Sequence, residues 1–453
     1  MLSAMNDRTL NMTEGKPFRL ILSFAFPLML GNVFQQFYTV VDTAVVGKAL
    51  GVSGLAAMGA ADWLNWLMLS IVQGLTQGFG ILMAQAFGAR QTDRLRASVG
   101  ASVLLAVGAS LLLVLLGQLV ALPVLKLLRT PGDILPGSVL YLRVMFGGLP
   151  IVLAYNLFAC ILRSLGDGKT PLHAMVIASF VNIGLDLLFV LVFRWGIGGA
   201  AAATLIAQCC AAGICLVQLK GLPQLRLSHQ DLHPPVQLLT KLLSLGSPMA
   251  FQNAVIAIGG MIVQMVVNGF GVVFIAGITA TNKLYGILEI AALSYGYAMI
   301  TYIGQNQGAG HDSRVRQGAK TALGISLVTS AIIAAVMLLF GKWIVGCFLS
   351  GTPQEVSAAT EIAYRYLATM SLCLPILYVL HVYRSCLQGL GNTVLPMVSG
   401  IGEFVMRTGA ALTLPLLLGQ EGIYFAEVLA WLGADLILVP SWFLVLRQHK
   451  KRL

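Results

Sequence analysis

The sequence predicts an all-α membrane protein in which twelve transmembrane helices form two parallel six-helix repeats. The composition, the length of the apolar runs and an internal repeat predict this fold. Of the 453 residues, 58% are hydrophobic and only 10% carry a formal charge, and the mean hydropathy is +0.86. An ordinary soluble domain has about 25% charged residues. The composition therefore excludes an ordinary soluble protein.

Apolar runs in the first half of the chain predict six membrane-spanning helices. A bilayer core about 30 Å thick is crossed by ~20 apolar residues, and each run is bounded by charged residues or by Gly and Pro. In chain order the runs lie near residues 18–45, 53–84, 98–123, 136–159, 171–193 and 198–219. The polar residues 1–16 contain no cleavable signal sequence, so the first run is expected to remain in the mature protein.

The second half repeats this organisation with six further apolar runs. They follow the polar connection 220–241 and are again bounded by charged residues or by Gly and Pro. In chain order they lie near residues 242–268, 271–303, 319–348, 361–383, 394–417 and 422–446. Because the number of spans is even, both termini are expected on the same side of the membrane.

The distribution of basic residues predicts which side that is. With these spans, nineteen of the 28 Lys and Arg residues lie on the side of the termini, and seven lie on the opposite side. Basic residues accumulate in short cytoplasmic loops. We therefore expect a multi-pass protein of the cytoplasmic membrane with both termini in the cytoplasm. The net charge of +11 then reflects topology, and no basic domain outside the spans supports nucleic-acid binding.

Three correspondences in order indicate an internal duplication. Residues 85–96 return as residues 305–316 with five identities at an offset of 220, and residues 162–171 resemble residues 387–396. Pro27 and Asn32 correspond to Pro248 and Asn253 at an offset of 221. We expect an N-terminal six-helix lobe at residues 1–225 and a C-terminal lobe at residues 226–453. Two parallel bundles that rock about a shared midplane site are typical of transporters.

The motifs resemble those of the multidrug and toxic compound extrusion (MATE) family. The matching residues recur in the family's order: Pro27, Val41, Asp42, Thr43, Gly47, Gln85, Gly88, Ala89, residues 162–167 with Pro171, and residues 196–204. The resemblance implies two six-helix lobes around a central cleft that switch between outward and inward states. It also implies export of organic cations in exchange for protons or sodium, by a protein of bacterial origin.

Acidic residues inside predicted spans indicate where an ion would bind. An acidic side chain at a helix centre costs about 2.5 to 3.5 kcal/mol on insertion scales, so Asp42 and Asp186 need an explanation. Each lies one helical turn after a polar residue, Asp42 after Tyr38 and Asp186 after Asn182. If the two helices face each other, the carboxyl groups share a polar pocket with Asn156. Repulsion and desolvation then favour protonation of at least one of them.

The resemblance supports these positions as a cation-coupling site. Asp42 matches the first-helix aspartate of the proton-coupled members, and Asn182 and Asp186 match a fifth-helix pair. Further polar neighbours match at Tyr141, Asn156 and Thr204. Sodium at Asp42 and Asp186 stays an alternative, because carboxylate, amide and hydroxyl oxygens suit a hard cation. A purely structural role, such as hydrogen bonding to buried hydroxyl groups, is the other alternative.

The C-terminal lobe carries its own charges, which we expect to bind substrate. Glu403 and Arg407 lie one turn apart and can instead neutralise each other as a structural pair. Glu289 has no local partner and could meet a cationic substrate, whereas Lys283 and Arg407 could meet an anion. A polarizable wall for flat ligands is expected from Tyr285, Met261 and Met265, although such residues usually pack against another helix or lipid.

The chain lacks the sequence motifs of nucleotide-driven transporters and of familiar hydrolases. No phosphate-binding loop, zinc-protease motif or nucleophile elbow occurs in it. We therefore expect no cofactor, and a proton or sodium gradient as the energy source of an antiporter for small molecules that functions as a monomer in the lipid bilayer. The alternatives are a flippase or exporter of a lipid-linked or anionic metabolite and, from another class, a membrane-embedded enzyme.

Overall fold

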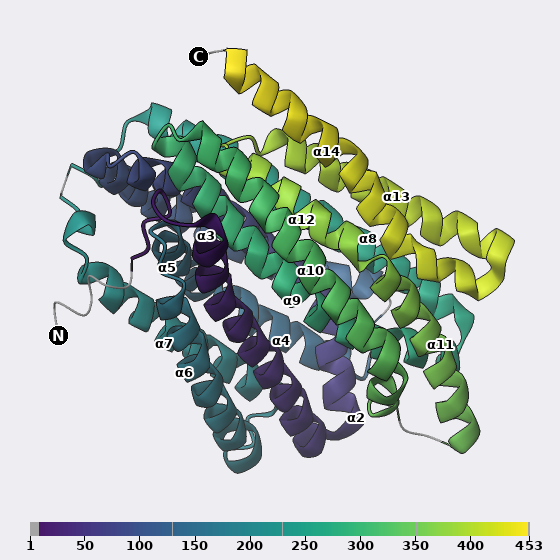
Figure 1. Cartoon of the computed structure of the whole chain (residues 1–453). Coiled ribbons are helices and arrows are strands. Elements are labelled where there is room, and N and C mark those ends of the chain that lie inside the picture. Colours follow the sequence, from purple (N-terminus) through teal and green to yellow (C-terminus); the bar gives the residue numbers. More distant parts are fainter. Residues whose placement is uncertain (1–8, 129, 229, 350–351, 452–453) are drawn as a thin grey trace. The chain divides into compact units, whose positions relative to one another are not determined.

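The computed structural model describes residues 9–128, 130–228, 230–349 and 352–451, and regular structure in these ranges is entirely helical. The first eight residues of the polar leading segment lie outside this description. Figure 1 shows the helices in chain order. The α-helices of the first half are α2 (Pro17–Gly88), α3 (Thr92–Leu127), α4 (Leu135–Gly147), α5 (Leu149–Ser164), α6 (Lys169–Asp186) and α7 (Gly196–Lys220). Those of the second half are α8 (Val236–Val267), α9 (Val272–Gly308), α10 (Asp312–Gly346), α11 (Pro353–Leu372), α12 (Leu374–Gly389), α13 (Val394–Leu418) and α14 (Ala426–Lys451).

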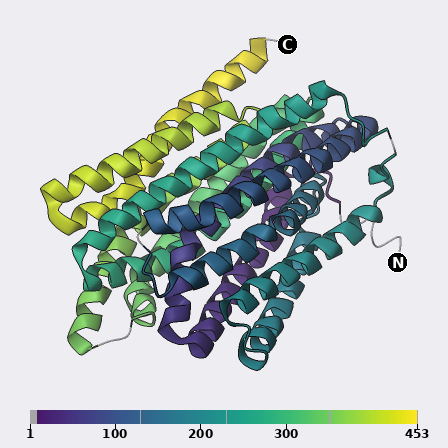
Figure 2. The same cartoon turned by 180° about the vertical axis from the view of Figure 1, so that it is seen from behind.

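The membrane spans agree with the twelve that the sequence predicts. Among the described residues, nine helical stretches are long and apolar enough to cross a membrane, and two bent helix pairs raise the number to eleven. One of the nine, Val394–Gln448, contains 55 residues. At 1.5 Å per residue it is far too long for one crossing of a core about 30 Å thick. It contains α13 and α14, which are separated by the 3-10 segment η4 (Gly419–Phe425) and run side by side (Figure 2). Counting these helices separately gives twelve crossings.

A single residue separates the first two spans. The helix α2 is non-helical only at Gly51, whose φ of 68° lies in the left-handed region that glycine tolerates. The chain therefore turns there without a longer loop, and the spans are Pro17–Gly51 and Ser53–Gly88.

The fourth span of each half is bent, which the apolar runs did not predict. The helix pairs α4–α5 and α11–α12 bend by 48° and 49° at a short break. Pro150 and Pro375 lie at the start of the second helix of each pair. Proline lacks the N–H that would continue the preceding helix, and its ring clashes with the preceding turn. These prolines lie 225 residues apart, as do Leu162 and Leu387 of the repeated motif, so the bend belongs to the duplicated unit.

The chain forms two compact units that do not coincide with the two halves of the sequence. The first contains the described residues up to Gly15, together with Phe26–Ala254 and Gly304–His311. The second contains Lys16–Ala25, Val255–Ile303 and the described residues from Asp312 onward. The division of the repeats at residues 225 and 226 therefore stays a prediction about the sequence.

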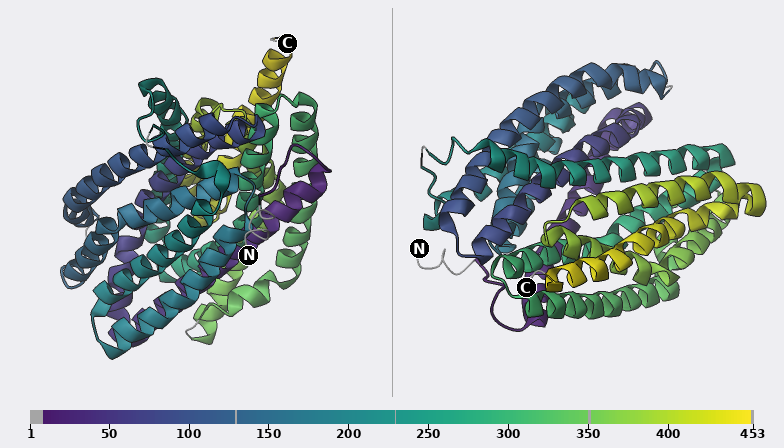
Figure 3. Two further views of the ribbon diagram at one scale, coloured as in Figure 1. Left: turned by 90° about the vertical axis from the view of Figure 1, so that its left-hand side faces the viewer. Right: turned by 90° about the horizontal axis from the view of Figure 1, so that it is seen from above.

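Within each unit, small residues allow helices to pack closely. In the first unit α7 packs against α5 and α6, and its residues Gly199, Ala200, Ala201 and Ala203 are buried. Small side chains let helix backbones approach, which is how helices associate in a membrane. In the second unit α14 packs against α12 and α13 (Figure 3). These contacts position the buried polar residues described next.

Candidate functional site

A buried acidic pair lies in the first unit. Asp42 lies on α2 and Asp186 is the last residue of α6. Their exposed fractions are 6% and 0%, and the two carboxyl groups interact with each other. Residues 144 positions apart in the sequence are thus brought into one polar cluster, the arrangement that the sequence predicts.

Four buried oxygen atoms of this cluster accept no hydrogen bond from the described residues. Among the described residues, no donor reaches Oδ1 of Asp42, Oδ1 of Asn182 or either carboxylate oxygen of Asp186. A buried acceptor without a partner costs free energy, and a buried charge costs more. A proton or a cation bound at these oxygens would remove that cost, so the cluster has the chemistry of an ion site.

Polar neighbours surround the pair. Asn182 donates from Nδ2 to Oγ1 of Thr204 at 3.5 Å, at the limit for a hydrogen bond. Tyr38 interacts with both acids. A small pocket in this unit is lined by Tyr38, Asn182, Thr204, Gln208, Met175, Ala178, Ala207 and Ala211. The predicted polar residues of three helices therefore meet around one space.

Two of the predicted neighbours lie less directly in this cluster. Tyr141 of α4 is buried, and its hydroxyl interacts with Asp42 and Asp62. Asn156 of α5 donates its amide hydrogen to the carbonyl oxygen of Val152 in its own helix, at 2.9 Å. One of its polar atoms is therefore engaged locally.

Three features of the cluster were not predicted from the sequence. Gln208 follows Thr204 by one helical turn and interacts with Tyr38, and this spacing is the signal that could have identified it. Asp62 interacts with Asp42 although it is itself exposed. Directly after Asp186 the helix widens into the π-helical segment η1 (Leu187–Val192). Such segments are frequent at functional sites.

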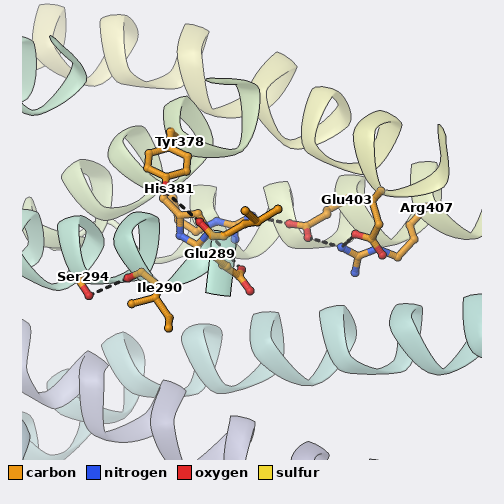
Figure 4. Close-up of polar contacts among 10 residues, drawn as sticks. Glu289, Ile290, Ser294, Tyr378, His381, Glu403 and Arg407 are labelled. Carbon is orange, nitrogen blue, oxygen red and sulfur yellow. Dashed lines mark hydrogen bonds and ion pairs between the residues drawn. The ribbon is translucent and has the colours of Figure 1, made fainter. Parts of the chain in front are cut away.

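The second unit contains a chain of buried ion pairs (Figure 4). Glu403 of α13 accepts hydrogen bonds from Arg384 of α12 at 2.6 Å and from Arg407 at 3.0 Å. Arg407 also donates to Glu427 of α14 at 2.8 Å and to the carbonyl oxygen of Ile256 at 3.2 Å. Two arginines and two glutamates neutralise each other here. The pair predicted between Glu403 and Arg407 is thus part of a network across three helices.

Glu289 has a partner that the sequence did not indicate. Its Oε1 lies 3.4 Å from Nε2 of His381, and its side chain remains 27% exposed. Near it, the hydroxyl of Tyr378 donates to the carbonyl oxygen of Leu288 at 2.9 Å. Figure 4 shows Glu289, His381 and Tyr378 close together. Glu289 is therefore more accessible than Glu403 and Glu427, whose side chains are 5% and 15% exposed.

The other residues predicted to bind substrate also belong to the second unit. Lys283 is exposed, and no ion pair to it is found among the described residues. Tyr285 stacks on Trp431 with ring centroids 6.1 Å apart. Met261 is half-buried, whereas Met265 is 68% exposed. Whether these side chains bind a flat ligand stays a prediction.

No cluster of transition-metal type is present in the described part of the chain. These residues contain no group of three or more His, Cys, Asp and Glu side chains that could hold a metal ion. The acids near Asp42, together with amide and hydroxyl oxygens, have the hard ligands that suit a sodium ion.

Twelve spans in duplicated halves, with buried ionisable groups inside them, are typical of a membrane transporter. The chain belongs to the MatE family, whose model matches residues 27–188 and 248–411. The two matched segments begin 221 residues apart and so confirm the duplication.

Similar proteins agree with this assignment. The probable multidrug resistance protein YpnP of Bacillus subtilis is 30% identical over 91% of both chains. A FAD transporter of Shewanella oneidensis is 23% identical over 74% of this chain and 75% of its own. The solved outward-facing structure of a multidrug resistance MATE family transporter is 21% identical, covers 98% of this chain and 99% of its own, and has a TM-score of 0.90.

Membership of this family distinguishes a transporter from a membrane-embedded enzyme. The protein is a multi-pass membrane transporter of small molecules with the twelve-helix MATE fold, and its relatives include bacterial proteins. Members of this family are transporters, so the membrane-embedded enzyme is excluded.

Proposed function

We propose that the protein is an ion-coupled antiporter that exports organic, cationic and lipophilic compounds across the cytoplasmic membrane of a bacterium by alternating access. This proposal rests mainly on the buried acidic pair of Asp42 and Asp186. Three of its four carboxylate oxygens are buried and accept no hydrogen bond from the described residues. Both termini are on the cytoplasmic side, and one chain, with N-terminal and C-terminal lobes divided near residue 225, is the functional unit.

Ion binding at this pair supplies the coupling. A proton shared by the two carboxyl groups, or a sodium ion held by them with Asn182 and Tyr38, offsets one of the two negative charges of the pair. An ion drives transport only if it prefers one conformation over another, or competes with substrate for the same ligands. Because α2 and α6 each contribute one acid, ion binding favours the arrangement in which these helices are close.

The charges of the second unit favour cations over anions as substrates. Both buried arginines, Arg384 and Arg407, are already neutralised by Glu403 and Glu427. Of the charges predicted to bind substrate, Glu289 and Lys283 lie outside this network, and the network itself offers no unpaired positive charge to an anion. Export of an anionic or lipid-linked metabolite is the second candidate, because one relative is a FAD transporter.

Efflux from proteoliposomes tests the proposal. A fluorescent lipophilic cation is loaded, and its release is followed under an imposed pH gradient and, separately, under a sodium gradient. We expect one gradient to drive release by the native protein and Asp42→Asn to abolish that release. Asp93→Asn, an exposed acid in the first turn of α3, is the matched control and is expected to leave the release unchanged.

Each alternative has its own result. Release that persists in the folded Asp42→Asn variant would exclude this coupling site. Release of FAD or another anion, without release of the cation, would replace cation export by the second candidate.

A further inference from the structure

The repeated motif Gln-x-x-Gly forms a reciprocal contact within the first unit. Gln85 and Gly88 end α2, and Gln305 and Gly308 end α9. A Cβ atom added to Gly88 would overlap the backbone carbonyl of Gln305, and one added to Gly308 would overlap the carbonyl of Gln85. Each glycine of the motif is therefore required by the backbone of the other copy.

The close approach of α2 continues along α8. A Cβ atom on Gly78 would meet the backbone of Gly246, and one on Gly74 would lie 2.7 Å from the Cα atom of Ala250. At these positions no larger side chain fits between the helices. The last four turns of α2 are thus sealed by backbone contacts against the start of α8 and the end of α9.

The segment Leu10–Thr13, which we call the strap, is bound across this crossing. The side chain of Met12 is fully buried. Its N–H donates to Oε1 of Gln305 at 2.8 Å, and its carbonyl oxygen accepts from Nδ2 of Asn306 at 3.0 Å. Both backbone polar groups of one strap residue are therefore bound by the second copy of the motif.

Gln305 also connects the strap to the end of α5. Its Nε2 donates to the carbonyl oxygen of Ser164 at 3.0 Å. Two residues later Gly166 has a φ of 83°, and a Cβ atom there would overlap the carbonyl oxygen of Leu10. Gln305 is therefore a junction between the strap, α9 and the loop after α5.

We propose that the two Gln-x-x-Gly motifs form a gate that closes the transport path at this end of the first unit, and that the strap secures it. This inference rests on the alternating access proposed above, because a path open to one side at a time needs a closure that can separate. The crossing contains backbone contacts and amide hydrogen bonds. When these contacts separate, no charged group is left without a partner. A few residues after the strap the chain enters α2 at Pro17, and the same span carries Asp42. Movement of that span therefore acts directly on the strap.

Distance measurements by pulsed electron paramagnetic resonance test the gate. Spin labels are placed at Asp93→Cys and His311→Cys in protein whose seven native cysteines are replaced by alanine or serine, in lipid nanodiscs. Both positions are exposed and belong to the first unit. We expect a major short-distance population from the closed crossing and a minor longer one.

Two variants open the gate in different ways. In Gly88→Ala the new methyl group prevents closure. In Gln305→Ala the strap loses the side chain that binds the N–H of Met12 and the carbonyl oxygen of Ser164. Removing a buried hydrogen-bond partner or forcing a clash is expected to shift the ratio of long to short distances about fivefold or more. The matched controls are Gly59→Ala, where no atom lies within 4 Å of the added Cβ, and Gln118→Ala, which removes an exposed hydrogen bond from α3 to the carbonyl oxygen of Arg143. Both controls are expected to keep the native distribution.

The distances are measured without substrate or ion gradient, so they report on the gate even if the proposed coupling is wrong. Unchanged distances in monodisperse Gly88→Ala and Gln305→Ala protein would overturn the proposal. If Gly88→Ala does not fold, Gln305→Ala decides, with faster hydrogen exchange of the strap amides as proof that the strap is released. A released strap with native distances would likewise overturn it.

Discussion

Arg407 illustrates how a buried charge is tolerated in this protein. Its guanidinium group contacts Glu403, Glu427 and a backbone carbonyl oxygen, and only 6% of its side chain is exposed. Desolvation of these groups is offset only while every member of the network is present. The network therefore fixes the packing of α12, α13 and α14, and the sequence position of Arg407 alone does not make it a substrate ligand.

Replacement of Arg407 by methionine is predicted to destabilise the protein strongly. Arg407→Met leaves two glutamates with fewer partners, and breaking a buried ion pair costs about 3 to 5 kcal/mol. Thermal unfolding in detergent, followed by tryptophan fluorescence, measures the effect. Lys283→Met removes an exposed base and is expected to unfold like the native protein. Equal stability of the two variants would contradict a structural role for Arg407.

For single residues, the sequence identified the charged side chains inside the spans better than it identified their ion-pair partners. Asp42 and Asp186 stand out because an acid in an apolar run is costly. The pair of Glu403 and Arg407 follows from their spacing on one helix. The contacts of Arg384 with Glu403 and of His381 with Glu289 cross between helices, so they depend on packing that no local pattern specifies.

At the element scale, the helix α11 begins with a complete capping box. The hydroxyl oxygen of Thr352 accepts from the N–H of Glu355, and Oε2 of Glu355 accepts from the N–H and the hydroxyl of Thr352. These bonds satisfy backbone donors that have no partner in the first turn of a helix. They define where the fourth span of the second half begins.

Loss of this cap is predicted to loosen the first turn of α11 locally. Thr352→Ala removes the accepting oxygen, a change that costs about 0.5 to 2 kcal/mol in helices. Amide hydrogen exchange over residues 354–357 is therefore expected to become several-fold faster, with little change elsewhere. Thr352→Ser keeps the hydroxyl and is expected to exchange at the native rate. Native exchange rates in both variants would mean that the capping box does not hold this turn.

The sequence predicted helices from apolar length and therefore missed their internal breaks. The run near residues 136–159 was predicted as one helix, whereas the chain breaks at Gly148 between α4 and α5. Pro150 was the available signal, because proline disrupts the preceding turn of a helix. The π-helical segment after Asp186 has no comparable signal in its apolar sequence Leu187–Val192.

At the scale of the whole molecule, orientation follows from charge. The nineteen basic residues on the side of the termini include those of the stretch 90–96 and of its repeat at 314–316. The positive-inside rule predicts that both stretches, and the connection 220–241, lie in the cytoplasm. The first turn of α11 is then expected outside.

Labelling of single cysteines in intact cells is predicted to confirm this orientation. Gln230→Cys and Gln354→Cys are both exposed positions, in chains whose native cysteines are replaced. A membrane-impermeant maleimide is expected to label Gln354→Cys in intact cells and Gln230→Cys only after lysis. The reverse pattern would invert the topology and with it the direction of transport.

The overall fold was the most predictable property, because the duplication is visible both in the sequence and in the arrangement of the helices. The offsets near 220 in the sequence, the two segments matched by the family and the paired bends of 48° and 49° all arise from one repeated unit. The compact units could not be predicted, since residues 304–311 of the second half belong to the first unit. Residues 304–311 belong to the first unit because Gly304 and Gly308 allow the end of α9 to pack closely against the end of α2.

The most direct test of ion-coupled antiport at Asp42 and Asp186 is the ion flux that a substrate gradient drives. Coupling is reciprocal, so an imposed gradient of transported cation must move protons or sodium ions the other way. In proteoliposomes without an ion gradient, the native protein is expected to produce this flux, read with a pH-sensitive or sodium-sensitive dye. Asp186→Asn is expected to abolish the flux while exchange of labelled for unlabelled substrate continues. An undiminished ion flux in Asp186→Asn, or substrate transport without ion flux in the native protein, would contradict the account.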